Sequence, residues 1–221
     1  LQVLSHEIMN SLTPIVSLSA TVEDLFAEQT DLKKNQDEIE AQILEALSTI
    51  RHRAEGLDRF VRGYRELARL PEPSLKLTDL GALVREIAKL FNARWAASVT
   101  LDVVMSPGRI MARLDAVQME QALVNLLNNG AEAALGQSVA RVQLSVEVTN
   151  DAIFISIRDN GSGIDMALRE RIFEPFVSFK PGGNGIGLPL ARQIIQGHGG
   201  NLVLKSSNER SYWATTFEVR L

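Results

Sequence analysis

The chain has 221 residues, of which 45% are hydrophobic and 23% are charged, so it can form one large globular domain or two smaller ones. Its net charge of −4 gives no electrostatic reason to expect nucleic acid or an anionic membrane as a partner. Cysteine is absent, which excludes disulfides, zinc-thiolate sites and cysteine nucleophiles. No apolar run approaches the length of a membrane span, so we expect membrane contact only through segments outside this chain.

Residues 1–70 are nearly free of glycine and carry apolar residues at a heptad spacing, which predicts two helices with one apolar seam each. Polar residues 28–38 supply the turn between them. Two helices of this kind form an antiparallel hairpin, and two hairpins close a four-helix bundle, so we expect a homodimer. The first seam is Leu1, Leu4, Ile8, Ser11, Ile15, Leu18, Val22 and Leu25, with Ser11 its one polar position. The second seam is Ile43, Leu47, Ile50, Ala54, Leu57, Val61, Tyr64 and Ala68.

Pro71 and Pro73 end the second helix and mark the domain boundary, because proline cannot continue a helix. We therefore expect a dimerisation domain at residues 1–72 and a second domain at residues 75–221. The second domain mixes strands in hairpins with helices, which predicts an α+β fold: a two-layer sandwich with a mixed sheet. The expected helices are residues 80–93, 115–135 and 188–196, and the expected strands are residues 99–105, 109–114, 142–149, 152–158, 202–206 and 214–220.

Asp159 follows an alternating strand and precedes Gly161 and Gly163. Glycine lets a ligand approach the backbone closely, and a carboxylate accepts a hydrogen bond from an exocyclic amine. An Asp-Asn-Gly run is also an ordinary turn. The motif becomes a candidate nucleotide pocket because two further motifs accompany it.

The first companion is a helix with Asn125 and Asn129 on one face, four residues apart. An amide oxygen suits a hard cation such as Mg²⁺, and Gly130 after Asn129 leaves room for a ligand. The alternative is a buried asparagine that caps a neighbouring loop. That alternative is stronger for Asn128 than for Asn129.

The second companion is Gly183, Gly185 and Gly187, at alternate positions directly before a helix. Backbone N–H groups in such a loop, together with the helix N-terminus, form an anion site. The spacing matches neither the P-loop nor the dinucleotide fingerprint. Lys180 could add a phosphate contact, although a loop lysine is more often simply solvated.

His6 falls on the solvent face of the first helix when Leu1, Leu4 and Ile8 lie on the seam. An exposed neutral imidazole can act as a nucleophile, and the carboxylate of Glu7 beside it can assist. Asn10 shares the face of His6. Two other histidines, His52 and His198, are interpreted as a solvated surface residue and a helix-end cation respectively.

Together these motifs resemble the catalytic core of a sensor histidine kinase of a two-component system, over nearly the whole chain. Residues 5–14 resemble its H-box, 121–131 its N-box, 159–163 its first glycine box, 173–176 its F-box and 183–188 its second glycine box. All five stand in the family's order. Three short motifs are similar to those of the nitrogen-regulation branch of the family: Phe-Glu-Pro-Phe, Lys-Pro-Gly-Gly and His-Gly-Gly.

The resemblance implies an ATP-dependent protein kinase with a GHKL-type ATP-binding domain, a homodimer and a response regulator receiver domain as partner. His6 Nε2 would accept the γ-phosphoryl group with Glu7 as the assisting base, and Asn129, assisted by Asn125, would hold Mg²⁺. Asp159, Gly161 and Gly163 would form the adenine pocket. Residues 165–182 would form a lid packed by Phe173 and Phe176, and Gly183, Gly185, Gly187 and Leu188 would close over the phosphates. In the family, an Asn at the offset of Asn10 is associated with dephosphorylation of the regulator.

The chain departs from the family pattern at Gly130, where alanine is usual, at residues 177–179 after the F-box, and at Glu132, where some branches carry a lysine. Two alternatives remain: another ATPase of this fold, as in type II topoisomerases, Hsp90-like or MutL-like proteins, and a degenerate kinase that serves as a dimeric scaffold. The core is expected in the cytoplasm, and any inner-membrane anchor would lie outside this chain.

Overall fold

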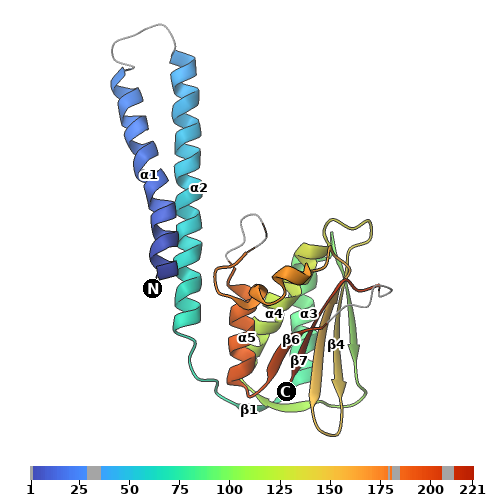
Figure 1. The fold of residues 1–221 in the computed structure, drawn as a ribbon. Coiled ribbons are helices and arrows are strands. Elements are labelled where there is room, and N and C mark those ends of the chain that lie inside the picture. Colours follow the sequence, from blue (N-terminus) through green and yellow to red (C-terminus); the bar gives the residue numbers. More distant parts are fainter. Residues whose placement is uncertain (1, 29–35, 179, 181–184, 206–211) are drawn as a thin grey trace. The chain divides into compact units, whose positions relative to one another are not determined.

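The computed structural model describes residues 2–28, 36–178, 180, 185–205 and 212–221. The chain divides into two compact units. The first contains helix α1 (Gln2–Glu28) and most of helix α2 (Gln36–Ala68), and the second begins at Glu66. The two long helices are drawn in blue and cyan in Figure 1.

The helices α1 and α2 contact each other through a small apolar cluster. Val22 of α1 is buried against Ile43 and Ala46 of α2, and Leu18 and Leu25 pack at its edge. Three of these residues lie on the first predicted seam and Ile43 lies on the second. Other large apolar side chains of the two helices are exposed in the single chain: Met9, Leu12, Val16, Leu44, Leu47, Val61 and Tyr64.

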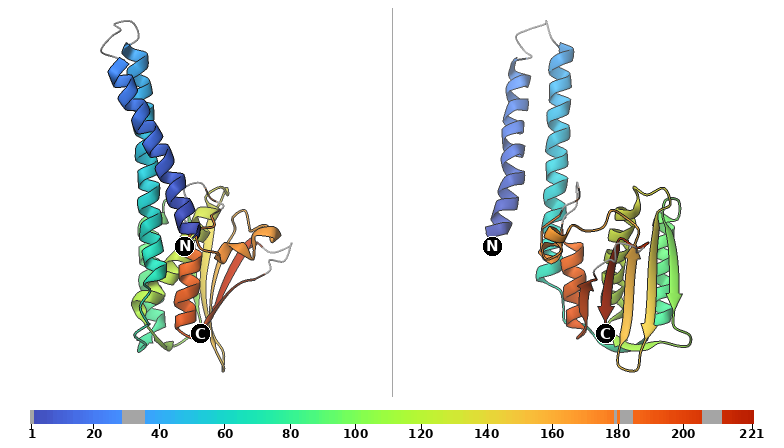
Figure 2. Two further views of the ribbon diagram at one scale, coloured as in Figure 1. Left: turned by 60° about the vertical axis from the view of Figure 1, so that its left-hand side comes forward. Right: turned by 45° about the vertical axis from the view of Figure 1, so that its right-hand side comes forward.

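The second unit is a mixed five-stranded sheet with helices on one face, as the views in Figures 1 and 2 show. The strand order is β2-β4-β5-β7-β6, in which β2 and β4 are parallel and the other neighbours are antiparallel. This confirms the predicted α+β class and mixed sheet. The strands are β2 (Thr100–Met105), β4 (Arg141–Val148), β5 (Ile153–Asp159), β6 (Asn201–Leu204) and β7 (Thr215–Arg220). The helices are α3 (Leu80–Trp95), α4 (Ala116–Ala134) and α5 (Gly187–Gly197), and short 3₁₀ turns span Met166–Leu168 and Arg171–Phe173.

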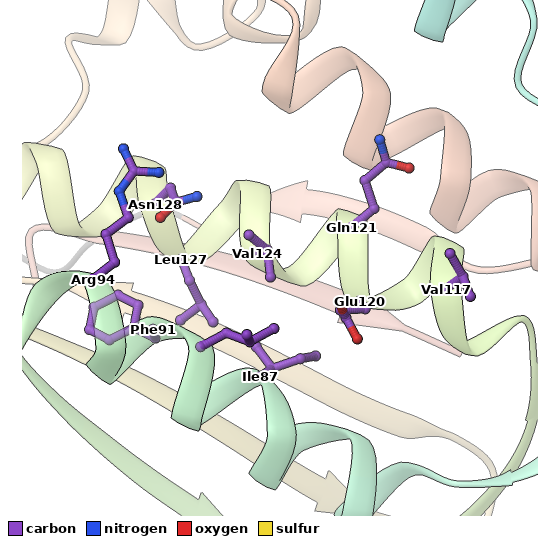
Figure 3. A pocket seen from close by; sticks show the side chains of 10 residues that line it. Ile87, Phe91, Arg94, Val117, Glu120, Gln121, Val124, Leu127 and Asn128 are labelled. Carbon is purple, nitrogen blue, oxygen red and sulfur yellow. The ribbon is translucent and has the colours of Figure 1, made fainter.

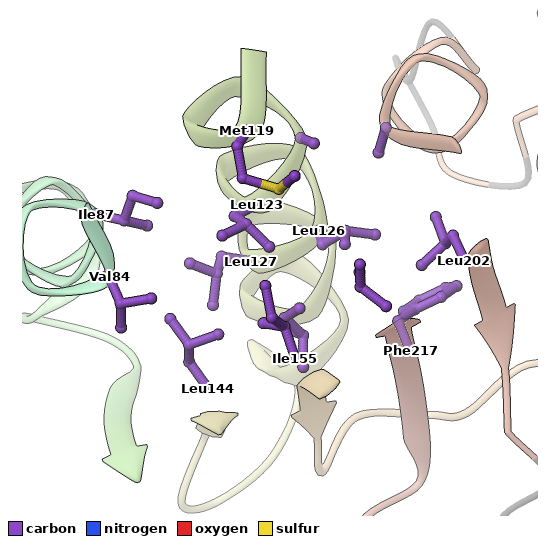
Figure 4. Packing of buried hydrophobic residues seen from close by; sticks show 14 of the residues in the cluster. Val84, Ile87, Met119, Leu123, Leu126, Leu127, Leu144, Ile155, Leu202 and Phe217 are labelled. Atoms are coloured by element: carbon purple, nitrogen blue, oxygen red, sulfur yellow. The ribbon is translucent and has the colours of Figure 1, made fainter. Parts of the chain in front are cut away.

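Helix α4 carries Asn125 and Asn129 and is called the asparagine helix. It is the central helix of the layer that covers the sheet. Its N-cap is Asp115, whose side chain accepts hydrogen bonds from the N–H groups of Val117 and Gln118. Met119, Leu123 and Leu126 are fully buried, and in Figure 4 they point toward the sheet residues Leu144 and Ile155. This apolar contact fixes which face of α4 the core uses, and so which residues remain for the site.

Two features differ from the expectations. Strand β3 (Met111–Leu114) does not join the main sheet but pairs with β1 (Lys76–Asp79), a strand too short for its pattern to predict. In addition, the second unit begins at Glu66 rather than near residue 75, because Leu67 and Leu70 pack against its core.

A candidate nucleotide site between helix α4 and strand β5

Asp159 ends strand β5 inside the sheet, between Val142 of β4 and Thr215 of β7. Its residue is only 2% exposed, and its Oδ1 accepts a hydrogen bond of 3.0 Å from the N–H of Gly161. A buried carboxylate needs polar partners, and this one lies at the end of a strand under a helix. The carboxylate is therefore a candidate acceptor for a polar group of a ligand.

Glycines allow β5 and α4 to approach each other at this point. A Cβ atom on Gly161 would lie 2.5 Å from the backbone oxygen of Ala133 in α4, a distance that no side chain tolerates. A Cβ on Gly130 would lie 3.4 Å from Asp159 Cβ and 3.5 Å from a methyl group of Val142, so Gly130 lies against the base of the Asp159 side chain. Gly163 has φ of +75°, a conformation that favours glycine. The first glycine box and the asparagine helix thus belong to one site.

Asn125 and Asn129 face the start of helix α5. A Cβ on Gly187 would lie 3.7 Å from Asn129 Nδ2 and 3.8 Å from Asn125 Cγ. The structure therefore brings together the second glycine box and the two asparagines that the sequence analysis placed on one face. Leu188 follows in α5 and packs half-buried against the core.

Asn128 faces the other way and contacts helix α3; it is half-buried and bonds to a helix, whereas the alternative interpretation predicted a buried asparagine that caps a loop. Its Oδ1 accepts a hydrogen bond of 2.8 Å from the indole Nε1 of Trp95 in α3. This bond sets the rotation of α4 against α3. The amide side chains of Asn125 and Asn129 are thereby directed toward α5.

A backbone hydrogen bond joins Phe176, at the end of the F-box, to Gly185 in the second glycine box. Phe176 N–H donates to Gly185 O at 2.9 Å, and Phe176 adopts a positive φ of 68°. A Cβ on Gly185 would lie 2.6 Å from the backbone of Phe176 and Val177, so only glycine fits there. Phe173 packs edge-on against Phe217, with the Arg192 guanidinium 4.9 Å from its ring centre. Both phenylalanines thus pack at the base of the expected lid, Lys180 is exposed, and Gly183 lies outside the described residues.

His6, Glu7 and Asn10 lie within helix α1, as predicted, but their side chains fall outside the described part of the structure. The described residues contain no cluster of three or more His, Cys, Asp or Glu side chains that could hold a metal ion. Mg²⁺ needs few protein ligands when phosphates complete its coordination, so an asparagine oxygen next to a phosphate site suits it.

Sequence reasoning missed Thr215, which is 4% exposed and directly opposite Asp159 in the β5–β7 ladder. Cross-strand neighbours share a face, so Thr215 and Asp159 lie on the same side of the sheet. Its signal in the sequence is a polar residue at an inward position of an alternating strand. Asn160, in contrast, is structural: it accepts from Arg141 N and donates to Val139 O and Tyr212 Oη.

His198 is the C-cap of α5, at the helix end where the sequence analysis placed it, and its ring contacts two backbone groups. Its Nε2 accepts the backbone N–H of Asp115 at 3.0 Å, and its Nδ1 lies 2.7 Å from Ile194 O.

A separate groove of about 460 Å³ lies between α3 and α4 (Figure 3). Leu90, Val117 and Val124 are among its apolar lining residues, with Arg94 and Glu120 also on its wall. It uses the α3-facing side of α4, whereas Asn125 and Asn129 face α5. The groove is therefore distinct from the candidate nucleotide site.

Comparison with known proteins agrees with this geometry. Residues 114–221 match the model of the histidine kinase-, DNA gyrase B- and HSP90-like ATPase family. Over 216 residues the chain is 30% identical to the nitrogen regulation protein NtrY of Azorhizobium caulinodans, covering 95% of this chain and 27% of that protein. The chain is a relative of the sensor histidine kinases. It is also 28% identical to sporulation kinase B of Bacillus subtilis, over 99% of this chain and 48% of that kinase.

Solved structures of histidine kinases share the fold of the ATPase domain. The catalytic domain of the kinase ThkA matches with a TM-score of 0.60 at 24% identity, over 67% of this chain and 95% of that one. ThkA in complex with the response regulator TrrA matches with a TM-score of 0.70 at 19% identity, over 100% of this chain and 60% of that chain.

The chain spans less than half the length of the two curated relatives, 27% of NtrY and 48% of sporulation kinase B. Among the described residues, no helix is both long and apolar enough to cross a membrane.

Proposed function

We propose that the chain is the catalytic core of an ATP-dependent histidine kinase that phosphorylates its own His6 and passes the phosphoryl group to an aspartate of a response regulator. One observation carries this proposal. A buried carboxylate, two asparagines and two glycine loops converge on one site, in a chain that also holds a His-Glu pair on a long helix.

In the nucleotide site, Asp159 accepts a hydrogen bond from the adenine amino group. Gly161 and Gly163 shape this pocket, because Gly161 lets the end of β5 approach Ala133 of α4 and Gly163 turns the chain with a positive φ. Asn129, assisted by Asn125, would hold Mg²⁺, and the ion would supply neutralisation of the phosphate charge. The first N–H groups of α5, with Gly183, Gly185, Gly187, Leu188 and Lys180, bind the phosphates.

The transfer itself requires His6 Nε2 to attack the γ-phosphorus in line with the leaving oxygen. The N–P bond forms, the bond from the γ-phosphorus to the bridging oxygen breaks, and ADP leaves with that electron pair. Glu7 takes the proton from Nδ1 as positive charge develops on the ring. Phosphoryl transfer depends on positioning more than on covalent chemistry, so delivery of ATP to His6 is the demanding step.

The proposed kinase function implies two partners, a second copy of the chain and a receiver domain. A second copy of the chain would cover the exposed apolar side chains of α1 and α2 and complete a four-helix bundle, with residues 1–65 as the dimerisation domain. A receiver domain would then take the phosphoryl group from His6. We place this core in the cytoplasm, with any inner-membrane anchor in segments outside the chain.

The decisive experiment incubates the protein with γ-labelled Mg-ATP and tests the acid and base stability of the label. A phosphohistidine is acid-labile and base-stable, and the variant His6→Gln should lose the label while its calorimetric ATP affinity stays unchanged. His52→Gln is the matched control and should label normally. Label that persists on His6→Gln, or ATP hydrolysis without label, would favour an ATPase of this fold without kinase activity.

We also propose that Asn10 holds a water in line with the phosphoaspartate of the regulator, because it lies one helical turn beyond His6 and a carboxamide both donates to and accepts from water. Asn10→Ala should leave labelling of His6 intact but slow the decay of pre-phosphorylated regulator in the presence of ADP. Decay at the parent rate would leave the protein a kinase alone.

A further inference from the structure

The segment that leaves helix α2 is bound to the start of the asparagine helix α4. Gln118 Nε2 donates to the backbone oxygen of Pro71 at 2.9 Å, and the backbone N–H of Ser74 donates to Asp115 Oδ2 at 3.0 Å. Asp115 is at the same time the N-cap of α4. We call these two bonds, from Gln118 and Asp115 to residues 71–74, the linker clasp.

The end of helix α5 completes the clasp from the other side. His198 Nε2 accepts the backbone N–H of Asp115 at 3.0 Å. A Cβ on Gly197 would lie 3.7 Å from Cγ and Cδ of Pro73, so the proline ring packs over this glycine. Residues 71–74 are thus held by the two helices whose other residues, Asn125 and Asn129 in α4 and Gly187 in α5, face each other in the nucleotide site.

Gln118 is an unusual residue for its place, because it is only 6% exposed on a helix that is otherwise apolar on its inner face. Its Oε1 is buried without a hydrogen-bond partner among the described residues. An unpaired buried acceptor destabilises a protein, and methionine of similar volume would avoid that cost. The residue is therefore poorly explained by stability and well explained by its bond to Pro71.

The last turn of α2 is captured as well. Leu67 and Leu70 pack half-buried against the ATPase core, which is why this unit begins at Glu66. Leu67 and Leu70 pack before the prolines, and Pro71 and Ser74 are held by hydrogen bonds, so the contacts follow one another along residues 67–74. Residues 67–74 are therefore held against the second unit.

We propose that Gln118 is a positioning residue for phosphoryl transfer: through Pro71 it fixes the linker to the ATPase domain and so limits the orientations in which ATP reaches His6. This inference rests on the proposed kinase function. A productive transfer needs the reacting atoms in a narrow range of distance and angle, and a free linker spreads the domain over orientations of which few qualify.

The variant Gln118→Met removes the donor to Pro71 and keeps the volume. We expect the rate of His6 labelling at saturating Mg-ATP to fall about tenfold, as small misplacements do in transfer reactions. The Kd for ATP should stay within about twofold, because Asn125, Asn129 and Asp159 keep their contacts. Gln193→Met, at an exposed position of α5, is the matched control and should change neither quantity.

A disulfide that holds the linker in place can show whether Gln118→Met acts by releasing the linker or by damaging the fold. The chain has no cysteine, so the pair Pro73→Cys and Gly197→Cys gives a single disulfide across the contact that these residues make. Oxidation of this pair should restore the labelling rate of Gln118→Met to that of the oxidised parent pair, and reduction should abolish the rescue. The disulfide should also form more slowly in Gln118→Met, since the linker is less often in place.

Three results would overturn the proposal: an unchanged or faster labelling rate in Gln118→Met, a parallel loss of ATP affinity, or a loss of rate that oxidation does not repair. If the parent does not label His6 at all, the kinase function fails instead. The rate of disulfide formation still tests the clasp in that case, because it needs no activity.

Discussion

At the scale of single residues, burial separates the candidate ligand contacts from their neighbours. Asp159 is almost fully buried and lies beside Thr215. The side chain of the next residue, Asn160, is hydrogen-bonded to the backbone of Val139 and Arg141. Adjacent positions in one motif therefore have different duties. The side chain direction that alternates along a strand is the reason.

The first prediction concerns Asp159. Asp159→Asn removes the charged acceptor for the adenine amine, an interaction worth about 1.5–3 kcal/mol, so the Kd for ATP should rise roughly 10- to 150-fold by calorimetry. Asp151→Asn changes an exposed carboxylate in the turn before β5 and serves as the control. Equal affinities for the two variants, with both folded by circular dichroism, would place the adenine pocket elsewhere.

A second prediction follows from Asp115, whose pKa is lowered by hydrogen bonds from the backbone N–H groups of Gln118, Ser74 and Val117 and by the nearby His198. A lowered pKa means that the folded state favours the carboxylate, so its contribution is complete above the ordinary Asp pKa of about 3.9. It is lost as pH falls through the lower pKa of the folded state.

The free energy of unfolding in urea should therefore fall with pH less steeply below about pH 4 in Asp115→Asn than in the parent. Asp151→Asn should follow the parent curve. A slope in Asp115→Asn identical to that of the parent would mean that the cap and linker bonds do not depend on the charge.

At the scale of elements, α4 has three working faces. One packs on the sheet through Met119, Leu123 and Leu126, one contacts α3 through the Trp95–Asn128 bond, and one presents Asn125 and Asn129 to α5. The first two faces fix the rotation of the helix. The third can then hold ligand atoms without further adjustment, which lowers the cost of binding.

The third prediction tests the close approach of β5 and α4. Gly161→Ala forces a Cβ to within 2.5 Å of Ala133 O, so the strand end must move. We expect a loss of about 1–3 kcal/mol in unfolding free energy and weaker ATP binding, because Gly161 N–H also holds Asp159. Gly136→Ala, with open space around the new Cβ, is the control and should leave ATP affinity unchanged.

At the scale of the whole molecule, the boundary between the units does not coincide with the prolines. The ATPase unit takes in the end of α2, through Leu67 and Leu70, before Pro71 and Pro73 are reached. Proline marks where a helix stops, whereas packing decides to which unit its last turn belongs.

The fourth prediction compares fragments 66–221 and 75–221. The longer fragment keeps two half-buried leucines and the linker bonds, so it should be more stable by about 2 kcal/mol in urea unfolding. Both should be monomers in sedimentation, and the intact chain at micromolar concentration should be a dimer through residues 1–70. Equal stabilities of the two fragments would show that the linker does not belong to the ATPase unit. A monomeric intact chain would contradict the four-helix bundle.

The sequence by itself determined the elements and motifs whose signals are local. Heptad spacing, alternating strands and the glycine runs all act within a few residues, so all the helices and strands longer than four residues, and the candidate residues of the nucleotide site, could be named in advance. Asp159, Asn125 and Asn129 were grouped into one candidate site because their motifs occur together in the chain, and the role of each residue came from the resemblance of the chain to a family.

Only the tertiary structure decided which of these residues share a surface. The pairing of β1 with β3, the Thr215–Asp159 neighbourhood, the Trp95–Asn128 bond and the contacts of Gln118 and His198 join positions far apart in the chain. No periodicity records such contacts, because a side chain at a given helical position packs, caps or binds according to the element that the fold places against it.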